Sequence, residues 1–470
     1  MTSQVVKGAD APIIDHEVID QLISAAAPVE GRLDEILAKA RELKGLSNAE
    51  AAELLSIENP DSVESILQTA AYVKMEIYGR RMVLFAPLYA GNRCANECLY
   101  CGFRSGNKDI HRVTLNKLQL EEETRALLKQ GHKRVLLLAG ETGHYGVDFM
   151  MDALETIYAV DEKGARVRRI NLEVAPMSVE DFRTLKTGGI GTYTCFQETY
   201  DPLLYKKYHL SGPKADYDYR LSVMDRAMEG GIDDVGMGVL FGLAPWKQEV
   251  LSLLDHSRYL DERWGCGPHT LSVPRLEPAP GAPVANAIPH PVSDAQFRLL
   301  VAVLRLTLPY TGIILSTRES KQMRDDLFRY GVSQASAGSR TTPGGYSEEA
   351  GSEFTHSQFS LSDHRTLHEV VSDMVDGGFV PSFCTGCYRK GRTGADFMDL
   401  AKPGLIKSYC LPNGLTSFAE YLEDYADDGL KKKGYALIGK LKAETLEDSV
   451  RERIEAGVSG IQAGGRDIYV

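Results

Sequence analysis

The sequence predicts an α/β protein: a (β/α)8 barrel of the TIM type, with an N-terminal helical extension and a mainly helical C-terminal domain. From about residue 82, short apolar runs alternate with longer amphipathic stretches, which is typical of right-handed βαβ units and a parallel sheet. Helical periodicity dominates before and after this region. Three cysteines lie near the start of the alternating region, and three more lie beyond its end.

Length and composition place the chain among ordinary globular proteins. It has 470 residues, 53 basic against 65 acidic side chains, and a formal net charge of -12. A chain of this size can bury about three quarters of its unfolded surface, so a large core is available. The acidic balance argues against nucleic acid and anionic membranes as partners, and no apolar run is long enough to span a membrane.

The amino-terminal part predicts a helical extension over residues 1–80. The first residues lack a basic stretch followed by an apolar one, so we expect no secretory signal and a cytoplasmic protein with reduced thiols. Ser47 and Glu50 form a capping-box pattern at the start of one helix. The expected helices are Asp15–Ala26, Arg32–Leu43, Ser47–Leu55 and Ser62–Tyr78.

The barrel is expected within residues 81–340, because strand and helix patterns alternate there often enough for eight βα units. The predicted strands are Met82–Leu88, Arg134–Ala139, Arg169–Val174, Gly191–Phe196, Asp234–Val239, Pro268–Val273, Gly312–Ser316 and Val332–Ala337. The predicted helices between them are Leu118–Lys129, Phe149–Val160, Val179–Thr187, Tyr217–Glu229, Trp246–Tyr259, Asp294–Leu306 and Glu319–Phe328.

Residues 341–470 predict a smaller, mainly helical domain. Its first part, Thr341–Ser360, is rich in glycine, serine and glutamate, which is typical of a linker. The helices expected after it are Asp363–Val375, Leu415–Tyr425, Gly429–Lys440 and Ala443–Ala456.

The first cysteine trio directly follows the first predicted strand. Cys94, Cys98 and Cys101 have the spacing C-x3-C-x2-C, and three thiolates so close together can hold three irons of a cubane cluster. The fourth iron then stays open and can chelate the amine and carboxylate of a small molecule. A zinc site or three unrelated thiols are the alternatives, although structural zinc usually takes four ligands.

The second trio, Cys384, Cys387 and Cys410, lies near the carboxyl end with the spacing C-x2-C-x22-C. No histidine follows Cys410 to complete a zinc site, which favours a second iron–sulfur cluster over zinc but does not exclude zinc. His269 lies on the sixth predicted strand. A single histidine in such a place is more often structural than a metal ligand.

These motifs resemble those of a known family. The first trio matches the radical SAM superfamily, whose members bind S-adenosyl-L-methionine (SAM) on the open iron. With the second trio, the Gly-Pro-His269 stretch and Ser316-Thr317-Arg318-Glu319 taken into account, the whole set of motifs resembles that of the HydG family of FeFe-hydrogenase maturases. The resemblance runs from about residue 20 to the end. The 2-iminoacetate synthases, or ThiH family, are similar in the barrel but lack the second trio.

The resemblance implies a set of site residues and cofactors. A 4Fe-4S cluster and SAM would lie at the first trio, and an auxiliary 4Fe-4S cluster with an additional labile iron at the second. His269 would bind that iron. Ser316 and Arg318 would be catalytic, with Arg318 pairing with a tyrosine carboxylate. Expected contacts to SAM come from Tyr100 near the adenine, Glu141 near the methionyl ammonium, and also Gly140, Glu173 and Arg220 at strand ends.

The implied reaction is the cleavage of the Cα–Cβ bond of L-tyrosine to p-cresol and dehydroglycine. The auxiliary cluster would convert dehydroglycine to carbon monoxide and cyanide on iron for H-cluster assembly. A low-potential electron donor and other hydrogenase maturases are the expected partners. We expect the C-terminal domain to cap the lower end of the barrel, opposite the usual active-site face. The alternatives are a ThiH-like 2-iminoacetate synthase and a non-enzymatic iron–sulfur carrier.

Overall fold

The computed structural model describes residues 12–27, 31–347, 356–402 and 405–470. The first residues of the chain, on which the absence of a secretory signal was predicted, lie outside the described residues, as does the middle of the predicted linker. The division into segments 1–80, 81–340 and 341–470 stays a prediction.

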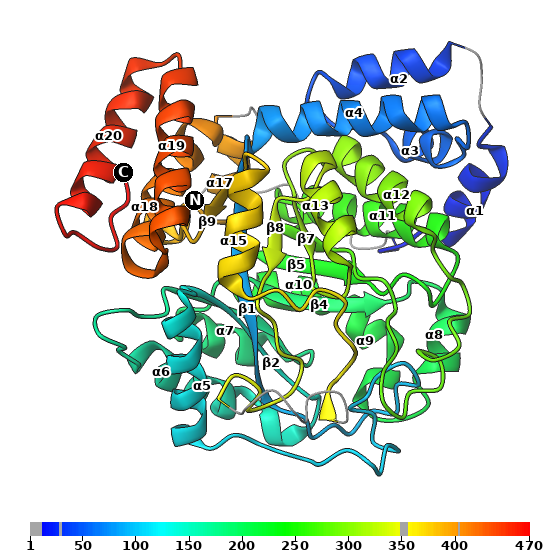
Figure 1. Cartoon of the computed structure of the whole chain (residues 1–470). Helices are drawn as coiled ribbons and strands as arrows, with labels where there is room; N and C mark the ends of the chain where they lie inside the picture. Colours follow the sequence, from blue (N-terminus) through cyan, green and yellow to red (C-terminus); the bar gives the residue numbers. More distant parts are fainter. Residues whose placement is uncertain (1–11, 28–30, 348–355, 403–404) are drawn as a thin grey trace.

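Eight parallel strands close into a barrel, which confirms the predicted fold class (Figure 1). Each strand pairs with the next, and β1 pairs with both β2 and β8, which closes the ring. The strands are β1 (Arg81–Gly91), β2 (Arg134–Ala139), β3 (Arg169–Glu173), β4 (Tyr193–Glu198), β5 (Val235–Val239), β6 (Thr270–Ser272), β7 (Gly312–Leu315) and β8 (Gln334–Ser336).

The helices between the strands pack outside the barrel, where their apolar faces cover the sheet. Capping boxes begin several of them, for example Asn116 with Gln119 and Ser293 with Gln296. The predicted helix Tyr217–Glu229 is divided at Ser222. The barrel helices are α5 (Lys117–Gln130), α6 (Val147–Ala159), α7 (Val179–Thr187), α8 (Pro202–Tyr208), α9 (Tyr217–Leu221), α10 (Val223–Glu229), α11 (Trp246–Trp264), α12 (Asp294–Thr307) and α13 (Lys321–Tyr330), with short 3-10 turns at Gly143–Tyr145 and Pro213–Ala215.

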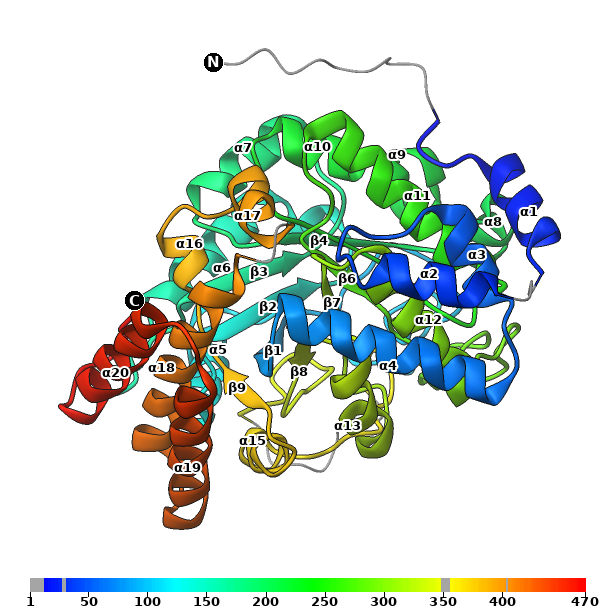
Figure 2. The same ribbon diagram turned by 90° about the horizontal axis from the view of Figure 1, so that it is seen from above.

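The amino-terminal helices lie over the amino-terminal ends of the strands (Figure 2). The longest of them, α4, packs along α12 and α13, and its Asn59 accepts hydrogen bonds from two backbone amides of the first turn. The helices are α1 (His16–Ala25), α2 (Arg32–Ala40), α3 (Asn48–Leu55) and α4 (Pro60–Ile77).

The carboxyl-terminal part occupies the other half of the same end of the barrel (Figure 2). Most of it is helical, as predicted: α15 (Leu367–Asp376), α16 (Gly386–Arg389), α17 (Gly394–Ala401), α18 (Lys407–Tyr425), α19 (Asp428–Glu444) and α20 (Asp448–Gln462).

Two features of this part differ from the sequence prediction. Strand β9 (Val380–Ser382) joins the barrel sheet, with Arg81 opposite Val380 and Val83 opposite Ser382. Helix α18 begins at Lys407 and continues through Pro412, although proline inside a helix removes a hydrogen bond and usually ends it. Cys410 therefore lies in the first turn of a helix rather than in a loop.

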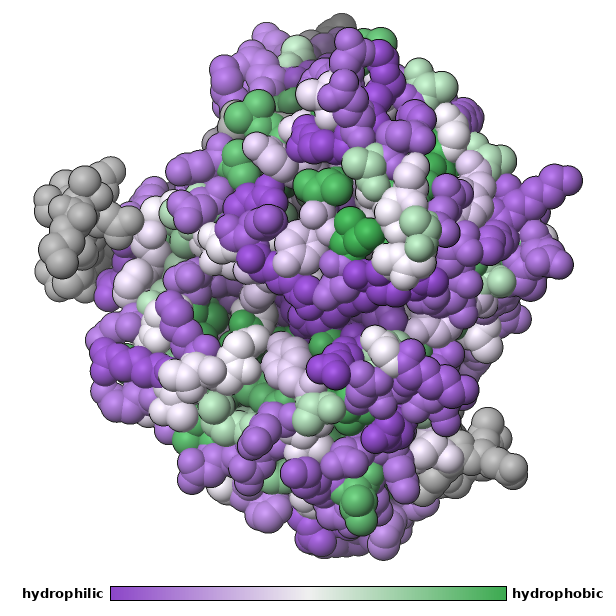
Figure 3. Space-filling view, turned by 90° about the vertical axis from the view of Figure 1, so that its left-hand side faces the viewer, coloured by the Kyte–Doolittle hydropathy of each residue, from purple (hydrophilic) through white to green (hydrophobic). Residues whose placement is uncertain are grey.

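The surface over these helices and over α5 and α6 is mainly hydrophilic, with small, separate apolar patches (Figure 3). Among the described residues, no helix has both the length and the apolar composition that a membrane span needs.

A buried arginine ties the end of α12 to the starts of two strands. Arg305 is fully buried, and its guanidinium donates to the carbonyl oxygens of Pro309 (2.7 Å), Thr311 (2.8 Å) and Gly331 (2.7 Å). Thr311 directly precedes β7, and Gly331 lies shortly before β8. Loss of the side chain would leave several buried carbonyls without donors, which costs about 1–3 kcal/mol for each group.

We therefore expect Arg305→Met to lower the free energy of unfolding by about 3 kcal/mol or more, measured by urea denaturation. Arg298→Met is the matched control: Arg298 lies on the same helix in a partly exposed ion pair with Asp326, and such pairs contribute no more than about 1 kcal/mol. Equal effects of the two substitutions would contradict the role of Arg305.

Candidate active site and second cysteine site

The first cysteine trio lies in the loop after β1, at the carboxyl-terminal ends of the strands. Cys94, Cys98 and Cys101 all line one cavity. Backbone hydrogen bonds hold the loop to its neighbours, from Ala95 N to the Glu141 carbonyl (2.9 Å) and from Leu99 N to the Tyr208 carbonyl (3.0 Å). The loop therefore presents the three thiols together, at the face where barrels place their active sites.

Gly140 is required by the cysteine loop itself. A Cβ atom at Gly140 would lie 2.1 Å from the Arg93 carbonyl oxygen and 3.2 Å from the Cys94 Cβ. Only glycine lets the end of β2 approach the loop so closely. Gly140 also lines the cavity, where it was predicted to contact SAM.

Glu141 belongs to a buried network of charges on the cavity wall. Its carboxylate accepts from Arg220 (2.9 Å) and from Asn96 (2.9 Å). Burial would raise the pKa of Glu141, but Arg220 and Lys214 lower it to about 2. The Lys214 ammonium lies 3.7 Å from Glu141 and 2.5 Å from Glu198, so the two carboxylates and two cations keep one another charged.

Glu198 reaches this network from a strained backbone. Its φ is +71°, a conformation that side chains other than glycine seldom adopt, and the pairing of β4 with β5 shifts register at this point. Such strain and bulges concentrate at functional sites. Burial opposes the charge of Glu198, but Lys214 and Arg220 lower its pKa.

Tyr100 lies between two cavities. Its ring lines the cysteine cavity and a second, adjoining cavity, and its hydroxyl pairs with His209 Nε2 at 2.8 Å. His209 Nδ1 lies 2.8 Å from the Tyr205 carbonyl, and burial lowers the pKa of His209 to about 3. The ring of Tyr100 is thus held in place by a neutral histidine.

The adjoining cavity contains Ser316 and Arg318, which follow β7. The Arg318 guanidinium stacks on the Phe359 ring at 3.3 Å from its centre, and burial lowers the Arg318 pKa. Glu173, at the end of β3, lines both cavities. Burial, reinforced by the charge of Glu198, raises the pKa of Glu173 to about 7.

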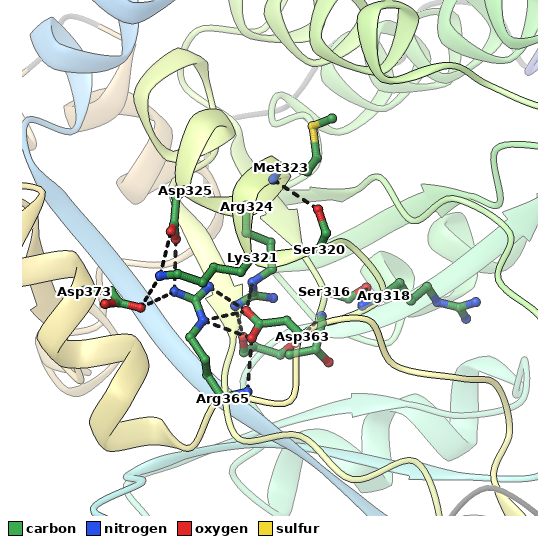
Figure 4. A network of polar contacts seen from close by, with 12 residues as sticks. Ser316, Arg318, Ser320, Lys321, Met323, Arg324, Asp325, Asp363, Arg365 and Asp373 are labelled. Atoms are coloured by element: carbon green, nitrogen blue, oxygen red, sulfur yellow. Dashed lines mark hydrogen bonds and ion pairs between the residues drawn. The ribbon is translucent and has the colours of Figure 1, made fainter.

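An ion-pair network holds the segment that carries Arg318 (Figure 4). Asp363 pairs with Arg324 at 2.8 Å and with Arg365 at 2.6 Å, and the Thr317 carbonyl accepts from the backbone amide of Asp363. Arg318 points away from this network (Figure 4). The network therefore fixes the backbone of the segment and leaves the Arg318 side chain to the cavity.

The second trio lies at the opposite end of the barrel, by the amino-terminal ends of the strands. Cys384, Cys387 and Cys410 line a cavity together with His269. Cys384 follows β9, whose pairing with β1 brings it under the barrel. The Cys384 Sγ accepts from Gly386 N at 3.3 Å, while burial raises the pKa of Cys387 to about 12.

Buried arginines surround this lower cavity, and the sequence analysis did not single them out. The lining includes Arg81, Arg134 and Arg169. Arg134 donates to the Cys384 carbonyl at 2.7 Å, and Arg169 lies 3.4 Å from the centre of the Tyr388 ring. Burial disfavours the charge on Arg81, but the three cysteines together raise its pKa. The cavity is therefore suited to an anionic group.

His269 faces this cavity from the start of β6. Its Nδ1 lies 3.7 Å from Asp234 Oδ1 and is buried without a hydrogen-bond partner among the described residues. Burial lowers the pKa of His269 to about 4, so the imidazole is neutral, as metal ligation requires.

The cavity of Arg318 and the lower cavity are lined by neighbouring residues of the same strands. On β1, Val83 lines the lower cavity, and Phe85 and Pro87 line the cavity that contains Arg318. On β8, Gln334 lines the lower and Ser336 the upper. Residues two apart on a parallel strand point to the same side and are about 6.6 Å apart. The two linings are thus successive layers of side chains on the same strands.

Sequence reasoning missed several residues of these sites. Asn96 lies inside the cysteine motif and Lys214 follows a Gly-Pro pair, but neither pattern indicates a role. Gln358 lies in the segment predicted to be a linker, yet it lines both upper cavities. Among the described residues, no three His, Cys, Asp or Glu side chains lie close enough together to hold a single metal ion.

Two family models match long stretches of the chain. Residues 88–254 match the radical SAM superfamily, and residues 272–380 match the biotin and thiamin synthesis associated domain. The 2-iminoacetate synthase of Salmonella typhimurium is 32% identical over 358 residues, which cover 75% of this chain and 91% of the relative.

Solved structures extend the likeness to nearly the whole chain. A crystal structure of HydG, a maturase of the FeFe-hydrogenase, has a TM-score of 0.94 at 44% identity and covers 98% of this chain and 100% of its own. The chain belongs to the radical SAM family of HydG and 2-iminoacetate synthase. HydG from Carboxydothermus hydrogenoformans has a TM-score of 0.80 at 38% identity, covering 94% of this chain and 96% of its own.

Membership in the radical SAM family implies SAM and a 4Fe-4S cluster. The residues that line the cavity of the first cysteine trio fit both. Burial raises the pKa of Cys94, Cys98 and Cys101, so cations such as cluster iron are needed to keep these thiols ionised. The adjoining wall of paired charges suits a zwitterionic molecule with a carboxylate, an ammonium and a sulfonium.

The raised pKa of Glu173 predicts a pH-dependent stability. The folded protein holds this proton up to about pH 7, whereas an unfolded glutamate loses it near pH 4.3. The stability that protonated Glu173 contributes is fully present below its unfolded pKa and is lost as pH rises through its folded pKa. Glu173→Gln should therefore raise the stability of the metal-free protein more at pH 8 than at pH 5, by on the order of 2–3 kcal/mol.

Urea denaturation at the two pH values measures this difference. The comparison must be made between variant and wild type, because burial also raises the pKa of Glu249 to about 7 and both proteins share that contribution. An equal effect of Glu173→Gln at pH 5 and pH 8 would contradict the assignment.

Proposed function

We propose that the chain is a radical SAM lyase that cleaves the Cα–Cβ bond of L-tyrosine to p-cresol and dehydroglycine. In this proposal the dehydroglycine gives carbon monoxide and cyanide on iron for assembly of the FeFe-hydrogenase H-cluster. The observation that carries the proposal is the placement of the two cysteine trios at opposite ends of one barrel, each in its own cavity. The match to HydG over nearly the whole chain supports it.

In the upper cavity, Cys94, Cys98 and Cys101 would hold the 4Fe-4S cluster. When bound, this cluster and SAM supply a carbon-centred radical that can abstract a hydrogen atom. The protein's own contribution is to orient SAM and to exclude water. Glu141 would act mainly through Arg220 and Asn96, since both of its oxygens already accept hydrogen bonds from them.

In the adjoining cavity, Arg318 and Ser316 would hold the amino acid substrate. The guanidinium makes no hydrogen bond or ion pair with the described residues, so its donors are available to a carboxylate, whose geometry they match. Stacking on Phe359 fixes the plane of the guanidinium. Glu173, on the opposite wall, would face the ammonium or phenol of the substrate.

At the lower cavity, Cys384, Cys387 and Cys410 would hold the auxiliary 4Fe-4S cluster, and His269 would bind an additional labile iron through its unpartnered nitrogen. The buried arginines would offset the negative charge of the cluster and its ligands. A low-potential electron donor, other hydrogenase maturases and a cytoplasmic setting belong to the same proposal, as does the division into an extension, a barrel and a cluster-carrying domain.

A ThiH-like role in thiazole synthesis is the second candidate, because 2-iminoacetate synthase covers 75% of this chain. It accounts for the barrel and the first trio but gives no role to the second trio or to the arginines around it. A carrier role without catalysis leaves the Arg318 cavity unexplained.

The two trios should separate the two steps of the proposed reaction. We expect Cys384→Ala with Cys387→Ala to retain p-cresol formation and to abolish carbon monoxide and cyanide, in assays with SAM, dithionite and tyrosine under anaerobic conditions. Cys98→Ala should abolish all products, because it removes a ligand of the first cluster. Chromatography detects p-cresol, and binding to deoxyhaemoglobin detects carbon monoxide.

Cys266→Ala is the control, since Cys266 is buried in an apolar cluster and lines neither cysteine cavity. If the reconstituted wild type forms neither p-cresol nor deoxyadenosine, the lyase proposal is wrong. If the double variant retains carbon monoxide, the role of the second trio is wrong.

Arg318→Gln should weaken the binding of tyrosine. The loss of a buried, charge-assisted contact to a carboxylate costs about 2–3 kcal/mol, so we expect KM for tyrosine to rise by about 30- to 150-fold. Arg340→Gln is a nearby control whose side chain does not line this cavity. Steady-state p-cresol kinetics measure the effect; an unchanged KM for Arg318→Gln would exclude it as the carboxylate partner.

A further inference from the structure

The segment after the predicted linker returns to the mouth of the barrel and brings Gln358 to the boundary of the two upper cavities. Gln358 lines both the cavity of the first cysteine trio and the cavity of Arg318. Neither the cysteine motif nor the proposed chemistry assigns a role to this side chain.

The backbone of Gln358 is fixed from two directions. Its carbonyl oxygen accepts from Gly102 N at 3.0 Å, and its amide donates to the Thr341 carbonyl at 3.0 Å. A Cβ atom at Gly102 would lie 2.9 Å from the Gln358 carbonyl oxygen, so the glycine after Cys101 permits this close approach. The segment is therefore seated directly on the cysteine loop.

The side-chain amide of Gln358 joins Tyr89 to Cys101. Its Nε2 donates to Cys101 Sγ at 3.8 Å, and its Oε1 accepts from the Tyr89 hydroxyl at 2.7 Å. Tyr89 is 3% exposed and also lines both cavities. The backbone amide of Phe103 is a second donor to the same sulfur, at 3.4 Å.

The chemistry of the two neighbours determines which way the amide faces. A primary amide has one donor end and one acceptor end. A metal-bound sulfur is negatively charged and accepts hydrogen bonds, whereas the buried phenol of Tyr89 keeps its proton and can donate. The opposite orientation would place the amide oxygen against a negative sulfur, so Tyr89 holds the N–H of Gln358 toward Cys101.

We propose that Gln358 is a positioning residue that donates a hydrogen bond to the Cys101 sulfur and thereby raises the reduction potential of the 4Fe-4S cluster held by the first trio. Tyr89 orients the donating amide. The inference rests on the proposed ligation of that cluster by Cys101. Hydrogen bonds to ligand sulfurs stabilise the more negative, reduced state of a cluster and are one determinant of its potential.

The test compares midpoint potentials of the reconstituted enzyme in the absence of tyrosine. Gln358→Met keeps a similar length and removes the N–H donor. We expect the cluster whose EPR signal responds to SAM to shift to a more negative midpoint, while the second cluster keeps its potential. Tyr89→Phe should shift the first cluster in the same direction by a smaller amount, because the amide remains but loses its anchor.

Ser360→Ala is the matched control. Ser360 lies on the same segment and donates to the Pro278 carbonyl, without contact to a sulfur, so its removal should leave both midpoints unchanged. An unchanged midpoint for Gln358→Met, at wild-type iron and sulfide content, overturns the proposal. If that variant does not take up its cluster, an unchanged midpoint for Tyr89→Phe overturns it instead.

The outcome is separable from that of the lyase proposal. A shifted midpoint in a protein that forms no p-cresol would reject tyrosine cleavage and support the role of Gln358. If the wild type forms p-cresol and Gln358→Met leaves the midpoint of the first cluster unchanged, tyrosine cleavage is supported and the role of Gln358 is rejected.

Discussion

Strand β1 is the constraint on which both sites depend. It is the strand that closes the barrel, pairing with β2 and β8, and its inward side chains line the lower cavity at Arg81 and Val83 and the upper cavities at Phe85, Pro87 and Tyr89. The first cysteine trio follows it directly. Because side chains on one face of a strand recur every two residues, the separation of the two proposed reaction steps follows from the length of one strand.

The two ends of the barrel handle buried charge differently. At the upper end, Glu141 and Glu198 are paired with Arg220 and Lys214, so the wall carries little net charge and can receive a zwitterion. At the lower end, several arginines face few carboxylates, and their charge is balanced only when the thiols are ionised. Burying unpaired charge is costly, and an anionic occupant of the lower cavity would offset this cost.

Much of the fold and part of the sites could be predicted from the sequence. The eight barrel strands follow from apolar runs, and the two trios follow from cysteine spacing. Strand β9 was missed because Val380–Ser382 is too short to show a pattern. The part of helix α18 before Leu415 was missed because Pro412 suggests a break. Lys214, Gln358 and Arg169 have ordinary sequence surroundings. Their roles arise only when the barrel brings distant strand ends together.

The pairing of β9 with β1 has a consequence for how such a protein can be altered. Because β9 pairs in register with the first residues of β1, from Arg81 to Val83, the carboxyl-terminal helices are joined to the barrel sheet itself. The carboxyl-terminal helices could be exchanged or lost only together with strand β9, which pairs with β1. A chain without these helices would therefore need other residues to cover the edge of β1 that β9 occupies here.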